Sequence, residues 1–233
     1  MQLLLTIGKN SLNEPILVDV CSLPHLFVAY SYDTQLQSFF QHCINTINNA
    51  YKSGKNIVIA IAVSNSNSHL LNEIVSPITL AFIPNSTINA TLNCNSKDVF
   101  ILQLFTEMKS RVKQQKQGKQ TAKYLPTLVV MIDELFSLIL SHKKQTGIYF
   151  LQLLIIGKQV GIYFIAASAS SYRNLLLQLM NMHPEIEKQL AKKQLTKNST
   201  IVKPLGAELI LTPDDLVFYK SITMPLHERY FKL

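Results

Sequence analysis

Short runs of apolar residues alternate with longer stretches of helical periodicity along most of this chain of 233 residues. The runs are nearly continuous in apolar residues, which is typical of strands in a parallel sheet that is covered on both faces. Six such runs lie at residues 16–20, 25–29, 57–63, 79–83, 127–132 and 163–167. The alternation predicts a doubly wound α/β fold, and the lack of any linker-like segment predicts a single domain over residues 1–233.

Apolar residues that recur every three or four positions predict helices between these strands. The helices are expected at residues 35–51, 97–115, 134–141, 149–160 and 171–182. One face of the second helix carries Phe100, Leu104, Met108 and Arg111. The segments 209–211 and 216–219, with the stretch that follows them, are interpreted as short strands that close one edge of the sheet.

Hydrophobic residues make up 48% of the chain and charged residues 15%, against about 25% charged in an average protein, which excludes disorder as the main state. The three cysteines match neither a disulfide framework nor paired metal ligands, and this favours a reducing compartment. The first residues lack the basic start of a secretory signal. Polar residues interrupt the most apolar stretch, 147–167, which is interpreted as a buried helix and strand. We therefore expect a cytoplasmic protein without a membrane segment.

The net charge of +8 comes partly from two basic runs that contain no acidic residue. The first run consists of Lys109, Arg111, Lys113, Lys116, Lys119 and Lys123, and the second spans residues 188–203. Such clusters favour a polyanion as partner, because each phosphate that is neutralised releases a counterion. The alternative is that they are solvated helix ends and loops that keep an apolar domain in solution.

Asp133 and Glu134 follow an apolar run at the point where the predicted strand ends. Carboxylates at the carboxyl end of a parallel strand lie at the crevice where α/β sheets bind ligands. In phosphate-transfer enzymes the aspartate of such a Walker B strand holds Mg²⁺, and the glutamate orients and deprotonates the attacking water. The alternative is that the pair merely opens the next helix, whose first turn favours acids.

A nucleotide site also needs the Walker A pattern G-x-x-x-x-G-K-S/T, whose backbone N–H groups and lysine bind the phosphates. Four glycines of this chain precede a lysine: Gly8, Gly54, Gly118 and Gly157. None of the four has the second glycine or the hydroxyl residue that the pattern requires.

The order of segments resembles the motor domain of the FtsK/SpoIIIE family of DNA translocases over nearly the full chain. The matching segments are L-P-H-L-F-V-A at 23–29, F-T-E-M-K-S-R at 105–111, L-P-T-L-V-V-M-I-D-E-L at 125–135, G-I-Y-F-I-A-A at 161–167 and G-A-E at 206–208. The lead-in at 7–19 is similar to that family's G-K-D…G-x-P-V-x-x-D stretch. The resemblance implies a RecA-like P-loop NTPase fold, with helices on both faces of a mostly parallel sheet.

The departures from the family fall on its nucleotide loop. Where the family has G-T-T-G-S-G-K-S, this chain has Y-S-Y-D-T-Q-L-Q at 30–37. The three glycines are replaced by Tyr30, Asp33 and Gln35, the lysine by Leu36, and the magnesium-binding hydroxyl by Gln37. Bulky side chains thus stand where the backbone would approach phosphate, Asp33 adds a negative charge, and Leu36 cannot neutralise an anion. The family's T-Q-R-P sensor is replaced by S-A-S-S at 168–171.

Three hypotheses remain from the sequence. In the first, the chain keeps the fold as a pseudo-ATPase that needs no cofactor, with Asp133 and Glu134 as remnants. In the second, it is an active ATP-dependent translocase of double-stranded DNA with an atypical loop, which would require ATP and Mg²⁺ and would use Asp133 as the metal ligand. The third hypothesis is an unrelated role, such as a structural subunit or adaptor, since a fold alone does not define a function.

In the FtsK/SpoIIIE family six subunits surround duplex DNA and contact its backbone without reading the sequence. The resemblance therefore implies a homo-oligomeric ring, with double-stranded DNA or motor-type protein subunits as partners, and residues 109–123 as the contact. The chain carries neither the membrane anchor nor the winged-helix tail of full-length family members. We expect it to be either a piece of a longer protein or a reduced relative.

Overall fold

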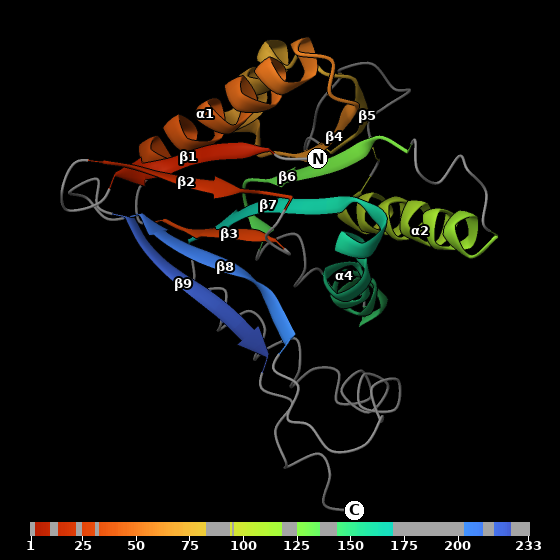
Figure 1. Cartoon of the computed structure of the whole chain (residues 1–233). Coiled ribbons are helices and arrows are strands. Elements are labelled where there is room, and N and C mark those ends of the chain that lie inside the picture. The colour runs from red at the N-terminus through yellow and green to blue at the C-terminus, as the bar shows by residue number, and fades with distance from the viewer. Residues whose placement is uncertain are drawn as a thin grey trace, which may run out of the picture.

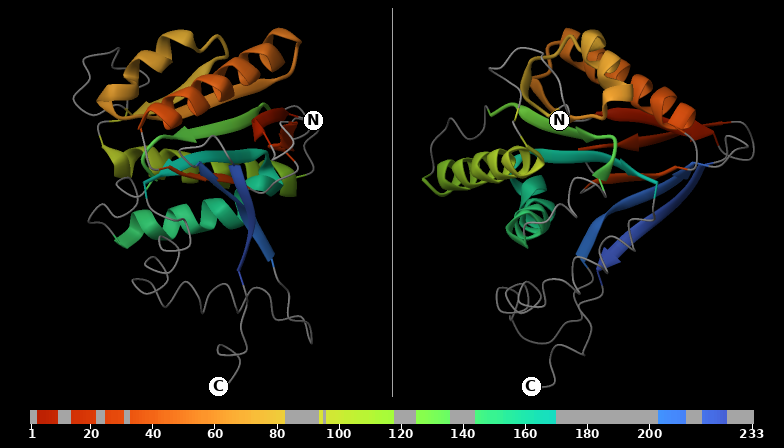
Figure 2. Two further views of the ribbon diagram at one scale, coloured as in Figure 1. Left: turned by 90° about the vertical axis from the view of Figure 1, so that its left-hand side faces the viewer. Right: turned by 180° about the vertical axis from the view of Figure 1, so that it is seen from behind.

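The computed structural model describes residues 3–9, 14–21, 25–30, 33–82, 94, 96–117, 125–135, 144–169, 203–211 and 217–224. These residues form an α/β structure in which helices cover both faces of a seven-stranded sheet (Figure 1). Figure 2 shows the same layers from the side and from behind, with α1 on one side of the sheet and α2 and α4 on the other.

The large sheet has the order β5-β4-β6-β7-β3-β8-β9, and all of its strands except β9 are parallel. Its strands are β3 (Leu26–Ala29), β4 (Ile57–Ala62), β5 (Ile78–Phe82), β6 (Thr127–Ile132), β7 (Ile162–Ser168), β8 (Lys203–Leu211) and β9 (Val217–Met224). Five of the six predicted strands occur here within a residue or two of the predicted bounds. The mostly parallel α/β fold and the two closing strands at the sheet edge are confirmed.

The sixth predicted strand, at 16–20, belongs elsewhere. It is β2 (Pro15–Asp19), which pairs antiparallel with β1 (Leu4–Lys9) in a separate two-stranded sheet. No element was predicted for the residues of β1. Residues 10–14 alone separate β1 from β2, and a connection this short joins antiparallel strands, because parallel neighbours need a crossover of about a dozen residues or more.

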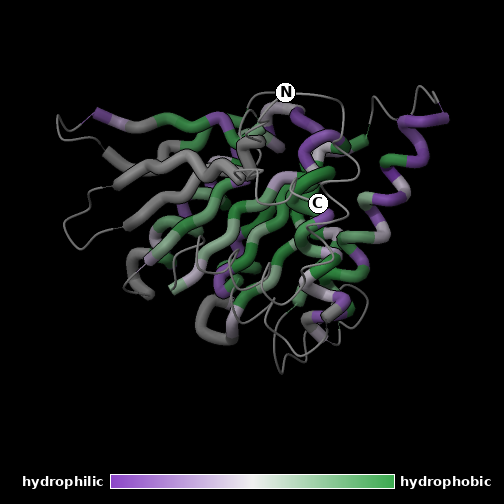
Figure 3. The backbone as a smooth tube through the Cα atoms, turned by 90° about the horizontal axis from the view of Figure 1, so that it is seen from below, coloured by the Kyte–Doolittle hydropathy of each residue, from purple (hydrophilic) through white to green (hydrophobic). Residues whose placement is uncertain are grey.

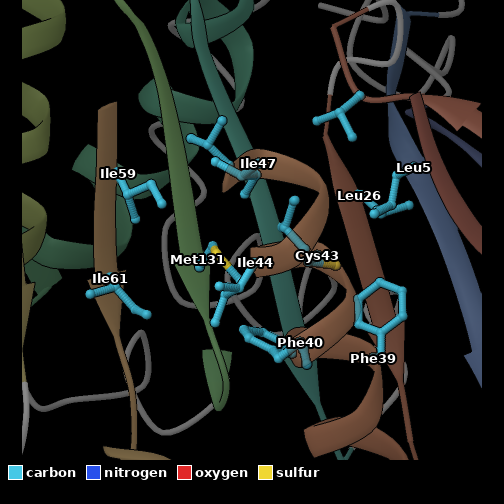
Figure 4. Packing of buried hydrophobic residues seen from close by; sticks show 14 of the residues in the cluster. Leu5, Leu26, Phe39, Phe40, Cys43, Ile44, Ile47, Ile59, Ile61 and Met131 are labelled. Atoms are coloured by element: carbon cyan, nitrogen blue, oxygen red, sulfur yellow. The ribbon is translucent and has the colours of Figure 1, made fainter. Parts of the chain in front are cut away.

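Helix α1 (Asp33–Lys52) covers one face of the large sheet together with the β1-β2 hairpin. Its buried side chains recur every three or four residues, and Figure 4 shows several of them packing on β4 and β6. The helix ends in a Schellman motif, because the N–H of Gly54 donates to the oxygen of Tyr51 and the N–H of Lys55 donates to that of Ala50. Gly54 has a φ of 86°, which this motif requires and which glycine adopts without strain.

The opposite face is covered by α2 (Lys97–Lys116), α4 (Lys144–Ile156) and the short helix η3 (Gly157–Val160). Another short helix, η1 (Asn65–Glu73), follows β4. Alternate residues of each central strand point to opposite faces, so that Val130 of β6 packs under α2 and α4 while Val129 and Met131 pack under α1. Figure 3 shows the apolar strands at the centre and more hydrophilic residues along α2.

The apolar stretch 147–167 is a helix followed by a buried strand, as predicted, since it forms α4, η3 and β7. Among the described helices, none combines the length and the apolar character that crossing a bilayer demands. The predicted helix at 171–182, most of the one at 134–141 and nearly all of the second basic run at 188–203 lie outside the described residues.

Candidate functional site

The carboxylate pair lies at the carboxyl edge of the parallel sheet, directly after β6. Asp133 is only 4% exposed, and its N–H donates to the oxygen of Ala62 at the end of β4. Glu134 is half-buried. Because β6 lies between β4 and β7, both side chains are within reach of the residues that end these neighbouring strands.

Ser64, which follows β4, donates two hydrogen bonds to Asp133. Its backbone N–H lies 2.7 Å and its Oγ 2.6 Å from Asp133 Oδ2. Ser64 is also the N-cap residue of η1, but its side chain makes no capping hydrogen bond there. The carboxylate of Asp133 therefore holds the turn at which η1 begins. Ser64 was not among the predicted site residues, although its place after a buried strand is the signal that identified Asp133.

Glu134 is held by the residue that follows β3 and by the last residue of β7. The hydroxyl of Tyr30, which follows β3, donates to Glu134 Oε2 at 3.1 Å, and Oγ of Ser168 donates to Oε1 at 3.4 Å. The N–H of Tyr30 donates to the backbone oxygen of Ser168 at 3.3 Å. Each of these three residues is thus hydrogen-bonded to the other two.

The connection between β3 and α1 is shorter than predicted, because α1 begins two residues before the expected helix start at 35. β3 ends at Ala29 and α1 begins at Asp33, so only residues 30–32 join the two elements. Asp33, Gln35, Leu36 and Gln37, which align with the family's nucleotide loop, are all residues of α1. The Leu36 side chain is 2% exposed and belongs to the core beneath α1.

These residues do not fit the triphosphate and Mg²⁺ that a P-loop ATPase binds. No glycine occurs between Gly8 and Gly54, and no lysine or arginine occurs between Lys9 and Lys52. The segment thus lacks both the glycines that let a backbone wrap around phosphate and the lysine that neutralises it.

His25 directly precedes β3 and is completely buried. Its Nε2 donates to the oxygen of Leu154 at 2.8 Å, and its Nδ1 accepts from the N–H of Phe164 at 3.2 Å. Burial lowers the pKa of His25 to about 4, so the ring is neutral at pH 7 and carries its proton on Nε2. The imidazole therefore ties β3 to β7 and α4.

The basic residues that were predicted to contact DNA differ in their surroundings. Lys109, Lys113 and Lys116 are exposed on the outer side of α2, whereas Lys119 and Lys123 lie outside the described residues. The inclusion of Arg111 was wrong, because its side chain is only 2% exposed.

Arg111 uses its donors inside the protein. Its Nε donates to Glu107 at 2.7 Å, and its Nη1 donates to the backbone oxygens of Pro126 at 2.8 Å and Val160 at 3.2 Å. The guanidinium thus joins α2 to the starts of β6 and β7 and cannot reach a phosphate in solution.

The outer side of α2 is positively charged without any contribution from Arg111. Lys109, Lys113 and Lys116 follow one another at intervals of four and three residues, which places them on one side of the helix. Of the two acids in α2, Glu107 pairs with Arg111, and Asp98 is hydrogen-bonded to Thr146 in the first turn. The far half of α2 therefore presents three lysines without a competing exposed, unpaired acid of its own.

A search of protein-family models finds no match for this chain, and neither does a search of curated proteins. Solved structures do match. The EccC structure from Thermomonospora curvata that contains ATPases 2 and 3 with a signal sequence peptide has a TM-score of 0.56 at 12% identity, covering 90% of this chain and 34% of that one. EssC (ATPases 2 and 3) from Geobacillus thermodenitrificans has a TM-score of 0.55 at 10% identity, covering 92% and 35%. Another match, described only as an ATPase, has a TM-score of 0.51 at 10% identity, covering 94% and 87%.

The chain therefore shares its fold with the ATPase domains of EccC and EssC, and this is the fold class that the sequence resemblance implied. The chain spans about a third of the length of the EccC and EssC structures that it matches. Identities of 10–12% show the shared fold alone, because one fold can serve many functions.

Proposed function

We propose that this chain is a pseudo-ATPase: a domain with a P-loop ATPase fold that binds the backbone of double-stranded DNA without hydrolysing ATP. The observation that carries the proposal is the join between β3 and α1, where the helix begins at Asp33 and Leu36 is buried in the core. The position of the phosphate-binding lysine is thus occupied by a residue that packs the domain together.

Hydrolysis would need more than a carboxylate pair. In phosphoryl transfer, the protein contributes positioning and charge stabilisation of the phosphates, with little chemistry of its own. Asp133 and Glu134 stand where such an enzyme places its acids, but the segment that would bind the phosphates offers no basic group. The carboxylates are also already engaged by Ser64, Tyr30 and Ser168.

The outer side of α2 is the surface that supports DNA binding. Three exposed lysines on one side of a helix can each neutralise one backbone phosphate, and none of them can read a base edge from there. Binding would therefore be independent of sequence and strongly dependent on salt. A ring of copies or motor-type subunits as partners is the competing proposal, and the experiment below separates the two.

The test measures the affinity for a 20–30 base-pair duplex (about two to three helical turns) at several salt concentrations, for the wild type and for the triple variant Lys109→Ala, Lys113→Ala, Lys116→Ala. The slope of log K against log [salt] should fall by roughly 0.9 for each phosphate that is no longer neutralised, so by about 2 to 3 in the triple variant. Lys52→Ala is the control, because Lys52 is exposed at the end of α1, on the other face of the sheet.

An unchanged slope in the triple variant would refute DNA binding through the outer side of α2 and would favour a protein partner.

The claim that the chain does not hydrolyse ATP is tested with millimolar ATP and Mg²⁺. We expect neither a rise in melting temperature nor release of phosphate, with or without DNA. Turnover that disappears in Glu134→Ala would instead establish an active ATPase, as the translocase hypothesis requires.

A further inference from the structure

Four strands of the large sheet end at one cluster of polar side chains. Tyr30 follows β3, Ser64 follows β4, Asp133 and Glu134 follow β6, and Ser168 is the last residue of β7. We propose that these five residues form a clasp, in which the two carboxylates accept hydrogen bonds from internal donors and so hold the four strand ends together without a ligand.

One half of the clasp joins β6 to β4. Asp133 is 4% exposed, and burying a carboxylate is costly unless hydrogen bonds replace the lost water. The N–H and the hydroxyl of Ser64 supply two short hydrogen bonds to the same oxygen, at 2.7 and 2.6 Å, and bonds to a charged acceptor are about twice as strong as neutral ones. The hydroxyl does not cap η1 although it stands at the N-cap, where serine is favoured for that purpose. Its side chain is thus committed to Asp133.

The other half joins β6 to β7 and β3. The phenol of Tyr30 donates to one oxygen of Glu134 and the hydroxyl of Ser168 to the other, at 3.1 and 3.4 Å. Tyr30 is the stronger donor of the two, because the bond from Ser168 is long for an O–H···O contact. Since β7 separates β6 from β3 in the sheet, the bond to Tyr30 spans two strand positions.

The clasp rests on the proposed function in one respect, because ATP and Mg²⁺ at this edge would need the same two carboxylates. The two roles predict opposite effects on stability. Carboxylates kept for a ligand destabilise the ligand-free protein, so that neutralising them raises the melting temperature. Carboxylates that already accept internal hydrogen bonds stabilise it, and neutralising them lowers the melting temperature.

The experiment compares melting temperatures without nucleotide and with a chelator present. Asp133→Asn, Glu134→Gln, Tyr30→Phe and Ser64→Ala should each lower the melting temperature by about 2 to 6 °C, as the loss of one or two hydrogen bonds predicts for a chain of this length. Tyr51→Phe is the control for the tyrosine change, because Tyr51 is exposed on α1, and it should leave the melting temperature within about 1 °C. A rise, or no change, in both Asp133→Asn and Glu134→Gln would overturn the clasp.

Double variants test whether the residues act as pairs. Tyr30→Phe combined with Glu134→Gln should lower the melting temperature by clearly less than the sum of the two single changes, and the same holds for Ser64→Ala with Asp133→Asn. Additive changes would overturn the pairing. If Asp133→Asn does not fold, Ser64→Ala tests that half alone, because it removes only the hydroxyl.

The outcomes separate the clasp from the proposed function. Loss of stability in the clasp variants says nothing about DNA, so a failure of salt-dependent DNA binding would refute only the proposed function. Stabilisation by Asp133→Asn and Glu134→Gln would refute the clasp and would point to carboxylates kept for a ligand, but it would leave DNA binding through α2 untouched. A rise in the melting temperature with ATP and Mg²⁺ that depends on Asp133 would refute both.

Discussion

Nη1 of Arg111 donates a hydrogen bond of 2.8 Å to the backbone oxygen of Pro126, which joins α2 to the residue just before β6. The same nitrogen also donates to Val160 at the end of η3. Arg111 therefore stabilises the domain from within, although it belongs in sequence to a run of basic residues.

Arg111→Met should lower the free energy of unfolding by about 2 to 4 kcal/mol, because several backbone acceptors lose a charged donor. The salt dependence of the proposed DNA binding should not change. Lys113→Ala is the matched variant from the same helix, and it should do the reverse: reduce the salt slope and leave stability within about 0.5 kcal/mol. Urea unfolding and duplex titration measure the two effects. A reduced salt slope in Arg111→Met with unchanged stability would contradict this assignment.

The buried His25 should make stability depend on pH. The folded protein holds the pKa of His25 at about 4, and the unfolded chain has the ordinary value of 6.5. The unfolded state therefore binds the proton first, so that the contribution is fully present above pH 6.5 and is lost as the pH falls toward 4. Between pH 7 and pH 5 the loss is about 2 kcal/mol.

The variant His25→Gln removes this titration and should flatten the difference between pH 7 and pH 5 relative to the wild type. His42→Gln is the control, because His42 is exposed on α1. Denaturant unfolding at both pH values gives the comparison. An equal pH dependence in the wild type and His25→Gln would refute the role of the buried imidazole.

Leu36 should behave as a core residue. Leu36→Ala should cost about 2 to 5 kcal/mol of stability, as large-to-small changes in a core do. Leu36→Lys restores the lysine of the family's loop, but it buries a charge and should destabilise the protein without producing a rise in melting temperature with ATP. Ser38→Ala, on the exposed side of α1, should stay within about 0.5 kcal/mol. Stabilisation of Leu36→Lys by ATP would show that the phosphate site is still present.

Substitutions of Gly54 test the backbone conformation at the end of α1. A Cβ placed on Gly54 would meet no atom within 4 Å, so the cost of Gly54→Ala comes from its φ of 86°. We expect a loss of about 1 kcal/mol or slightly more for Gly54→Ala and a smaller loss for Gly54→Asn, since asparagine tolerates this region better. Thermal or urea unfolding would show the order, and equal losses would contradict it.

Much of the fold was predictable because burial leaves a local pattern. The apolar runs that became β4, β6 and β7 are long enough to be recognised alone, and α2 showed its buried face through the spacing of Phe100 and Leu104. Asp133 and Glu134 were predictable for the same reason, since they directly follow such a run. The hairpin strand β1 was not, because it begins within a run of three leucines that shows no alternation, although Leu3 and Leu5 are buried and Leu4 is exposed.

The chain's own order of residues thus determined the alternation of strands and helices, the absence of a phosphate-binding glycine loop, and the position of the carboxylates. Tertiary structure decided which residues are hydrogen-bonded to these carboxylates. Ser64 and Asp133 are 69 positions apart, and Tyr30 and Glu134 are 104 apart, so their contacts exist only because parallel strands bring their carboxyl ends to one edge. Tertiary structure likewise separated Arg111 from its neighbouring lysines, because a helix turns successive side chains toward the core or toward water according to which face the sheet covers.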